Sequence, residues 1–168
     1  MAISMYRASI PVFAQYLTSL SAILTKAGAY CAAKKVEPTV LTATRLTPDM
    51  FALARQVQIA TDHAKGAAAR LSGTEVPSFA DTETTLDELQ ARIAKTLDFI
   101  HSIKPEAFDG SDDKDISLKA GPNVLNFKGE DYLTTFALPN FFFHLTTAYA
   151  ILREAGVEIG KKDFIGMK

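Results

Sequence analysis

The chain has 168 residues, of which 48% are hydrophobic and 22% charged, and its formal net charge is −1. A chain of this length can bury a core that needs no metal or disulfide, so we expect residues 1–168 to form a single domain. Acidic and basic residues are mixed along the chain without a long Lys or Arg run, which excludes a dedicated nucleic-acid-binding protein.

The first predicted helix has an apolar stripe whose members recur at alternating spacings of three and four residues. The stripe consists of Ile3, Tyr6, Ile10, Phe13, Leu17, Leu20 and Leu24. Pro11 lies off this stripe, and it marks either the first turn of a helix that begins near Ser9 or a kink in a longer helix. Pro38 then opens a short helical turn or loop.

Two further helices are predicted from their capping residues. Thr47 as the N-cap and Pro48 at the first helical position predict the start of the second helix, and Gly73 predicts its end. A capping box formed by Thr85 and Glu88 predicts the start of the third helix.

The second half of the chain changes its periodicity twice. Alternating apolar and polar residues predict a small β-hairpin over 116–127, with a turn at Gly121. The last long helix is predicted over 130–155, with Pro139 as an internal kink and an extended tail after Gly156. The sequence therefore predicts a mainly all-α fold, an antiparallel four-helix bundle with a small β-hairpin before the last helix.

The cellular location is inferred from what the chain lacks. Arg7 and Pro11 interrupt the first apolar stretch, and no basic region precedes it, so no signal peptide is expected. The apolar stretch 136–143 is too short to span a membrane. A single cysteine, Cys31, forms neither an internal disulfide nor a thiolate metal site. We expect a cytoplasmic protein with no membrane partner.

His144 is the residue that bears most directly on function. On the last helix it shares an inward-facing stripe with Asn140, one turn earlier. Burying two polar groups costs roughly a few kcal/mol unless they find partners, and Thr147 is one candidate partner. Two interpretations stay open: a hydrogen-bonded core pair that fixes the helix register, or a polar pocket that binds an unknown small molecule.

Histidines on the other helices raise the question of a metal. His63 lies at the edge of the second helix's stripe, where antiparallel packing could bring it towards His144. Candidate ligands of a divalent metal such as zinc or nickel are then His144, His63 and Asn140, of which Asn140 is a poor ligand. His101 closes the third helix, where a structural role is predicted. The leading expectation is no cofactor, with a divalent metal as the alternative.

Aromatic residues cluster on the last helix: Phe136, Phe141, Phe142, Phe143 and Tyr149. Three adjacent phenylalanines cannot share one helix face, so at least one of them is expected to point away from the core. An exposed patch of this kind favours a homodimer.

Three stretches of the sequence resemble a bacterial family, domain of unknown function 1993. They are Arg45-Leu-Thr-Pro-Asp-Met-Phe with the following Ala54-Arg-Gln-Val-Gln, Pro139-Asn-Phe-Phe-Phe-His-Leu-Thr-Thr-Ala-Tyr, and Leu152-Arg followed by Gly156-Val-Glu-Ile-Gly-Lys. The resemblance spans nearly the whole chain. It implies the fold of the DinB/YfiT-like metalloenzymes, whose bundle binds a divalent metal through three histidines.

The resemblance also carries a ligand pattern from which this chain departs. In those relatives one histidine comes from the second helix and a His-x-x-x-His pair from the fourth, and some of them are transferases that use small thiols. Asn140 and His144 take the paired positions here. The second-helix ligand corresponds to Gln56, Gln58 or His63. The leading hypothesis is a pocket that has lost its metal and binds a small molecule; the alternatives are a metal- or thiol-dependent transferase and a homodimeric interaction module.

Overall fold

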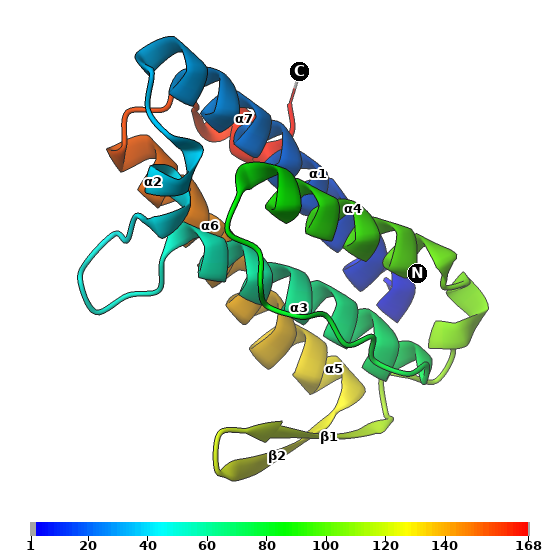
Figure 1. Cartoon of the computed structure of the whole chain (residues 1–168). Helices are drawn as coiled ribbons and strands as arrows, with labels where there is room; N and C mark the ends of the chain where they lie inside the picture. The colour runs from blue at the N-terminus through cyan, green and yellow to red at the C-terminus, as the bar shows by residue number, and fades with distance from the viewer. Residues whose placement is uncertain (1–2, 168) are drawn as a thin grey trace.

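The computed structural model describes residues 3–167, which form a mainly helical fold with a two-stranded antiparallel sheet. In chain order the elements are α1 (Met5–Lys34), α2 (Pro38–Ala43), α3 (Leu53–Ser72), α4 (Leu86–Ser102), a 3₁₀ turn (Pro105–Phe108), β1 (Asp115–Ala120), β2 (Asn123–Lys128), α5 (Gly129–Asp131), a π-helical segment (Tyr132–Ala137), α6 (Leu138–Glu154) and α7 (Lys161–Ile165). Figure 1 shows the long helices packed side by side, with the hairpin projecting at one end. The prediction of a mainly helical fold with a hairpin is confirmed, but its count of four helices omitted the short ones.

Helix α1 is a single 30-residue helix that continues through Pro11. Its first turn is capped by the Ser4 side chain, which accepts a hydrogen bond from the Arg7 backbone N–H at 3.3 Å. Of the two alternatives for this helix, the longer one, which contains Pro11, is therefore correct. Ile3, predicted as part of its apolar stripe, precedes the helix and is exposed. Helix α1 is long and apolar enough to cross a membrane, judged by length and composition alone. Core helices of soluble proteins have the same two properties.

The predicted start of α3 is wrong by about one and a half turns. Thr47 and Pro48 belong to a turn in which the Thr47 hydroxyl bonds the Asp49 carboxylate at 2.6 Å, and the helix begins at Leu53. The Leu53 backbone N–H donates to the Thr44 carbonyl at 2.9 Å, which closes the intervening loop. A residue type that favours a helix start also favours a turn, and here the turn prevails.

The capping box predicted for α4 is confirmed. The Thr85 hydroxyl accepts from the Glu88 N–H at 3.2 Å, and the Glu88 carboxylate accepts from the Thr85 N–H at 3.0 Å. Gly73 ends α3 in a left-handed conformation with φ of 79°, also as predicted.

The last long helix is continuous but contains a widened turn. The π-helical segment ends where the Leu138 N–H donates to the Leu133 carbonyl, five residues back. It lies directly before Pro139, which has no N–H to give the α-helical ladder. Hydroxyls of Thr134 and Thr135 bond the carbonyls four residues before them at 2.8 and 2.6 Å. The predicted kink is therefore a π segment, a feature that is frequent at functional sites.

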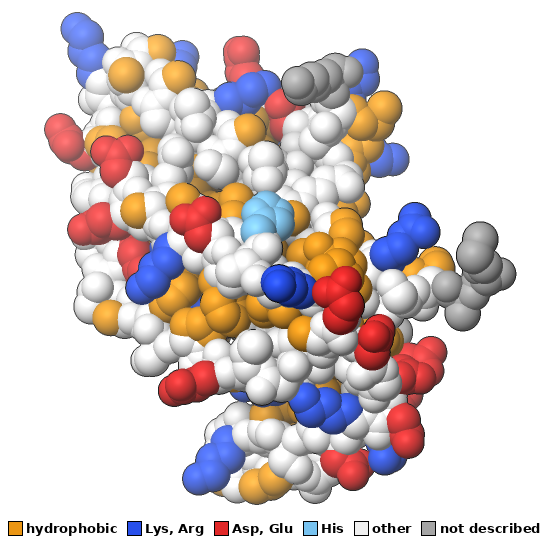
Figure 2. Space-filling view, turned by 90° about the vertical axis from the view of Figure 1, so that its right-hand side faces the viewer, with side chains coloured by type: hydrophobic (Ala, Val, Ile, Leu, Met, Phe, Trp, Pro, Cys, Tyr) orange, Lys and Arg blue, Asp and Glu red, His pale blue; other side chains and the backbone are white. Residues whose placement is uncertain are grey.

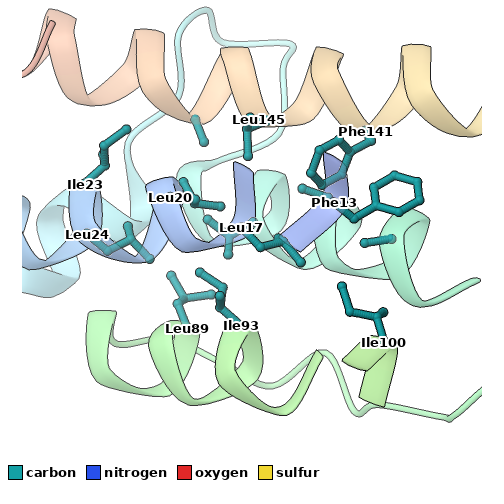
Figure 3. Close-up of a cluster of buried hydrophobic side chains, with 14 of the residues drawn as sticks. Phe13, Leu17, Leu20, Ile23, Leu24, Leu89, Ile93, Ile100, Phe141 and Leu145 are labelled. Carbon is teal, nitrogen blue, oxygen red and sulfur yellow. The ribbon is translucent and has the colours of Figure 1, made fainter. Parts of the chain in front are cut away.

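The core lies between α1, α3, α4 and α6. Figure 3 shows side chains of α1, α4 and α6 that point towards one another in it. Phe13 of α1 and Phe141 of α6 meet edge to face, with ring centroids 4.9 Å apart.

The tail, predicted as extended, instead ends in the short helix α7, whose Phe164 packs on Tyr149. Of the three adjacent phenylalanines, Phe143 points away from the core, as expected, and is 56% exposed. On the face in Figure 2, acidic and basic side chains are interspersed.

Candidate functional site

His144 of α6 is joined to α3 by a short hydrogen bond. Its Nδ1 lies 2.7 Å from Oε1 of Gln56, across 88 positions of sequence. Gln56 is buried at 1% exposure, whereas His144 is half-buried. The inward orientation predicted for His144 is therefore observed, with Gln56 as its partner.

The chemistry of Gln56 determines which nitrogen of His144 carries a proton. Nε2 of Gln56 lies 3.0 Å from the Phe51 carbonyl oxygen, which can only accept a hydrogen bond. The amide oxygen of Gln56 therefore faces His144, and Nδ1 of His144 must be the donor. In a neutral imidazole this leaves the lone pair on Nε2, the nitrogen that Gln56 does not occupy.

His63 of α3 stacks on the ring of His144. The two ring centroids are 6.1 Å apart and the planes are nearly parallel, at 12°. The pKa of His63 is lowered from 6.5 to about 4, chiefly by burial and then by His144, with Asp62 opposing the shift and Arg70 adding to it. Burial, followed by the positive charge of Arg55, also lowers the pKa of His144. Both imidazoles are therefore neutral at pH 7.

The contacts of these histidines belong to a longer row that we call the α3–α6 seam. Its members are Gln56, His63 and Arg70 on α3, and Tyr132, Phe136 and His144 on the π segment and α6. The His63 ring meets the Phe136 ring at 5.7 Å, and Arg70 Nη1 donates to the Tyr132 hydroxyl at 3.1 Å. The three α3 members recur every seven residues, a spacing that places side chains on one helix face and could have revealed the row from sequence.

Two predicted site residues bond their own helix. Asn140 donates from Nδ2 to the Phe136 carbonyl at 2.7 Å, and the Thr147 hydroxyl donates to the Phe143 carbonyl at 2.7 Å. The partner that the structure gives to His144 is Gln56. The resemblance left three candidates on the second helix for the missing ligand, and Gln58 was one of them. Its Nε2 donates a hydrogen bond to the Glu83 carboxylate at 3.0 Å.

The seam does not fit the three-histidine metal centre that the resemblance implies. Only two imidazoles, those of His63 and His144, meet in the seam, whereas the implied centre takes three. The other polar residues nearby are the amides of Asn140 and Gln56, and both are already hydrogen-bonded, Asn140 to the Phe136 carbonyl and Gln56 to His144. Within residues 3–167 no group of three His, Cys, Asp or Glu side chains is placed to hold a metal ion.

An apolar groove of about 450 Å³ lies beside the seam on the outer face of α6. It is lined by Leu46, Phe142, Phe143, Thr146, Thr147 and Ala150. The Phe143 ring stands edge-on to the His144 ring, with centroids 5.2 Å apart. Thr147 thus lies on the groove side of His144, next to an exposed aromatic ring.

Comparison with known proteins agrees with the resemblance seen in the sequence. The sequence model of the family described as "Domain of unknown function (DUF1993)" matches residues 5–165. Among solved structures, the chain is similar to the crystal structure of a DinB family member protein from Shewanella denitrificans, with 41% sequence identity and a TM-score of 0.91. The similarity covers 98% of this chain and 93% of that one. No curated protein matches the chain.

Proposed function

The chain belongs to the DUF1993 family, and from this premise we propose that it binds a small molecule at the α3–α6 seam, where His144, Gln56 and His63 meet. The scaffold is the set of four long helices, acting as an antiparallel bundle. A cytoplasmic single domain without a nucleic-acid or membrane partner remains part of this proposal.

The hydrogen bond between Gln56 and His144 is the observation that carries the proposal. A buried glutamine, itself oriented by the Phe51 carbonyl, holds Nδ1–H of His144 and fixes the tautomer. A hydrogen bond that fixes one ring nitrogen of a histidine is typical of sites where the other ring nitrogen binds a ligand. Nε2 of His144 is then a neutral acceptor for a hydrogen-bond donor of the small molecule.

The proposal assigns no step to a metal. The resemblance implies a divalent ion, but two imidazoles, His63 and His144, together with the amide at position 140 make a weak donor set for zinc or nickel. The residues that remain can bind and orient a small molecule and accept its proton.

A thiol-dependent transferase is the second candidate, and one observation favours it. Gln56 holds Nδ1–H of His144, so Nε2 is an unprotonated acceptor that can take the proton of a thiol S–H as general base while the sulfur attacks its substrate. Nδ1–H stays bonded to Gln56 in this step.

We expect the His144→Ala variant to lose ligand-induced thermal stabilisation. The measurement is a melting-temperature screen with small polar fragments, including glutathione as a test of the thiol candidate. A fragment present at about ten times its Kd stabilises the wild type by about 1.4 kcal/mol, or about 3–5 °C in a chain of this size. That shift should vanish in His144→Ala.

Matched variants keep this test interpretable. His101→Ala removes an exposed histidine at the end of α4 and should respond to fragments as the wild type does. Gln56→Leu keeps His144 but removes the acceptor of Nδ1–H, and it should weaken the same fragments. The proposal fails if no fragment stabilises the wild type, or if the same fragments stabilise His144→Ala equally.

A further inference from the structure

Arg70 lies at the end of the α3–α6 seam and has no carboxylate of residues 3–167 within ion-pair distance. The other arginines of α3 and α4 that face carboxylates, Arg55 and Arg92, each form ion pairs with Asp81. Arg70 forms no ion pair within the described residues, and its Nη1 donates to the neutral hydroxyl of Tyr132. A guanidinium carries five donors in a planar fork. Most of its donor capacity is therefore available.

Gly66 makes the position of this guanidinium possible. A Cβ placed on Gly66 would lie 2.5 Å from Arg70 Nη1 and 3.6 Å from its Cζ. Glycine is disfavoured inside helices, so a glycine in the middle of the 20-residue α3 calls for a packing reason. The absent side chain lets Arg70 fold back along the helix by one turn.

This fold-back carries the positive charge of Arg70 towards His63. Side chains on a helix lean to its N-terminus, and Gly66 lies between Arg70 and His63 on α3. The charge of Arg70 is one of the causes that lower the pKa of His63, as expected for a cation close to that ring. Arg70, Gly66 and His63 thus form one local arrangement at the seam.

We infer that Arg70 and His63 bind the oxyanion group, a carboxylate or a phosphate, of the small molecule that occupies the α3–α6 seam. This inference rests on the proposed function and specifies its ligand class. The planar fork of Arg70 matches two oxygens of a carboxylate or a phosphate. The neutral imidazole of His63 supplies one N–H donor without introducing a second fixed charge.

The test is a titration of the wild type with benzoate and, separately, with inorganic phosphate, followed by NMR on the imidazole signals of His63 and His144. We expect a saturable shift of the His63 signals within tens of millimolar for at least one of the two anions. The anion that binds more tightly distinguishes a carboxylate ligand from a phosphate ligand. In Arg70→Gln the affinity should fall by about tenfold or more, because a charge-assisted hydrogen bond is lost.

Gly66→Ala separates recognition from folding. The new methyl group displaces the guanidinium, which is the flexible end of a side chain, while alanine favours the helix. This variant should fold at least as stably as the wild type yet bind the anion more weakly. Arg153→Gln, at an exposed arginine of α6, is the control and should bind as the wild type does.

Two results would overturn the inference. One is the absence of a saturable His63 shift with either anion; the other is unchanged affinity in Arg70→Gln and Gly66→Ala. If fragments still stabilise the wild type through His144, only the oxyanion inference fails and the proposed function stands. If neither fragments nor anions act at the seam, both fail.

Discussion

We expect Arg92→Ala to lower the free energy of unfolding by about 3–5 kcal/mol, the range found when one partner of a buried ion pair is removed. The Arg92 side chain is 1% exposed and contacts three carboxylates. Its Nη2 lies 2.7 Å from Asp62, and its Nη1 lies 3.0 Å from both Asp81 and Glu83. Without the guanidinium these negative charges would face one another across a partly buried space.

The same arginine fastens the connection between α3 and α4. Nε donates to the Thr61 hydroxyl at 2.7 Å, and Nη1 donates to the Ala80 carbonyl at 3.2 Å. Loss of Arg92 therefore removes side-chain and backbone partners together, so we expect the segment 73–85 to become sensitive to proteolysis.

Urea unfolding of the two proteins measures this effect. Arg7→Ala, at an exposed arginine of α1, is the control and should change stability by no more than about 0.5 kcal/mol. A loss below about 1 kcal/mol in Arg92→Ala would contradict this expectation and show that the partners already present, Arg55 for Asp81 and Lys65 for Asp62, compensate these carboxylates on their own.

We expect His63 to make the protein less stable in acid. Its folded-state pKa is about 4, whereas in the unfolded chain it has its ordinary value of 6.5. Between these two pH values the unfolded state binds a proton that the folded state does not, so stability falls as pH is lowered through this window. At about 1.4 kcal/mol per pKa unit, the loss from this group between pH 7 and pH 4 is roughly 2–3 kcal/mol.

The variant His63→Gln isolates this contribution, because carboxylates also titrate near the lower end of the window. The groups that act on His63 are His144 from α6 and Asp62 and Arg70 on α3, and all three remain in this variant. Urea unfolding at several pH values should give a shallower decline for His63→Gln, while the exposed-site control His101→Gln keeps the wild-type decline. Identical pH profiles for the wild type and His63→Gln would contradict the expectation.

Local sequence signals were enough to predict most of the secondary structure. The capping box at Thr85, the glycine stop at Gly73 and the alternation in the hairpin each depend on residues only a few positions apart. Such contacts form within one element and do not need the rest of the fold. The helix start predicted from Thr47 and Pro48 was wrong, because the Leu53 N–H donates to the Thr44 carbonyl and the residues between them form a loop.

The candidate site was predicted only in part, for a physical reason. Periodicity on one helix placed His144 inward, but its partner comes from α3 and depends on how two helices align. Gln56 was one of three alternatives. The hydrogen bond that orients it, from its Nε2 to the Phe51 carbonyl, depends on a loop that was predicted as helix. Asn140 was expected to face the site, yet its amide bonds the Phe136 carbonyl in the widened turn before Pro139.

The protonation state of His144 at neutral pH tests the account most directly, and long-range ¹H–¹⁵N NMR of its imidazole measures it. A ring held by the Gln56 amide oxygen should be neutral, with the proton on Nδ1 and an unprotonated Nε2. In Gln56→Leu the same signals should shift towards a mixture of the two tautomers. A wild-type ring that carries its proton on Nε2, or on both nitrogens, would contradict a binding site built on that lone pair.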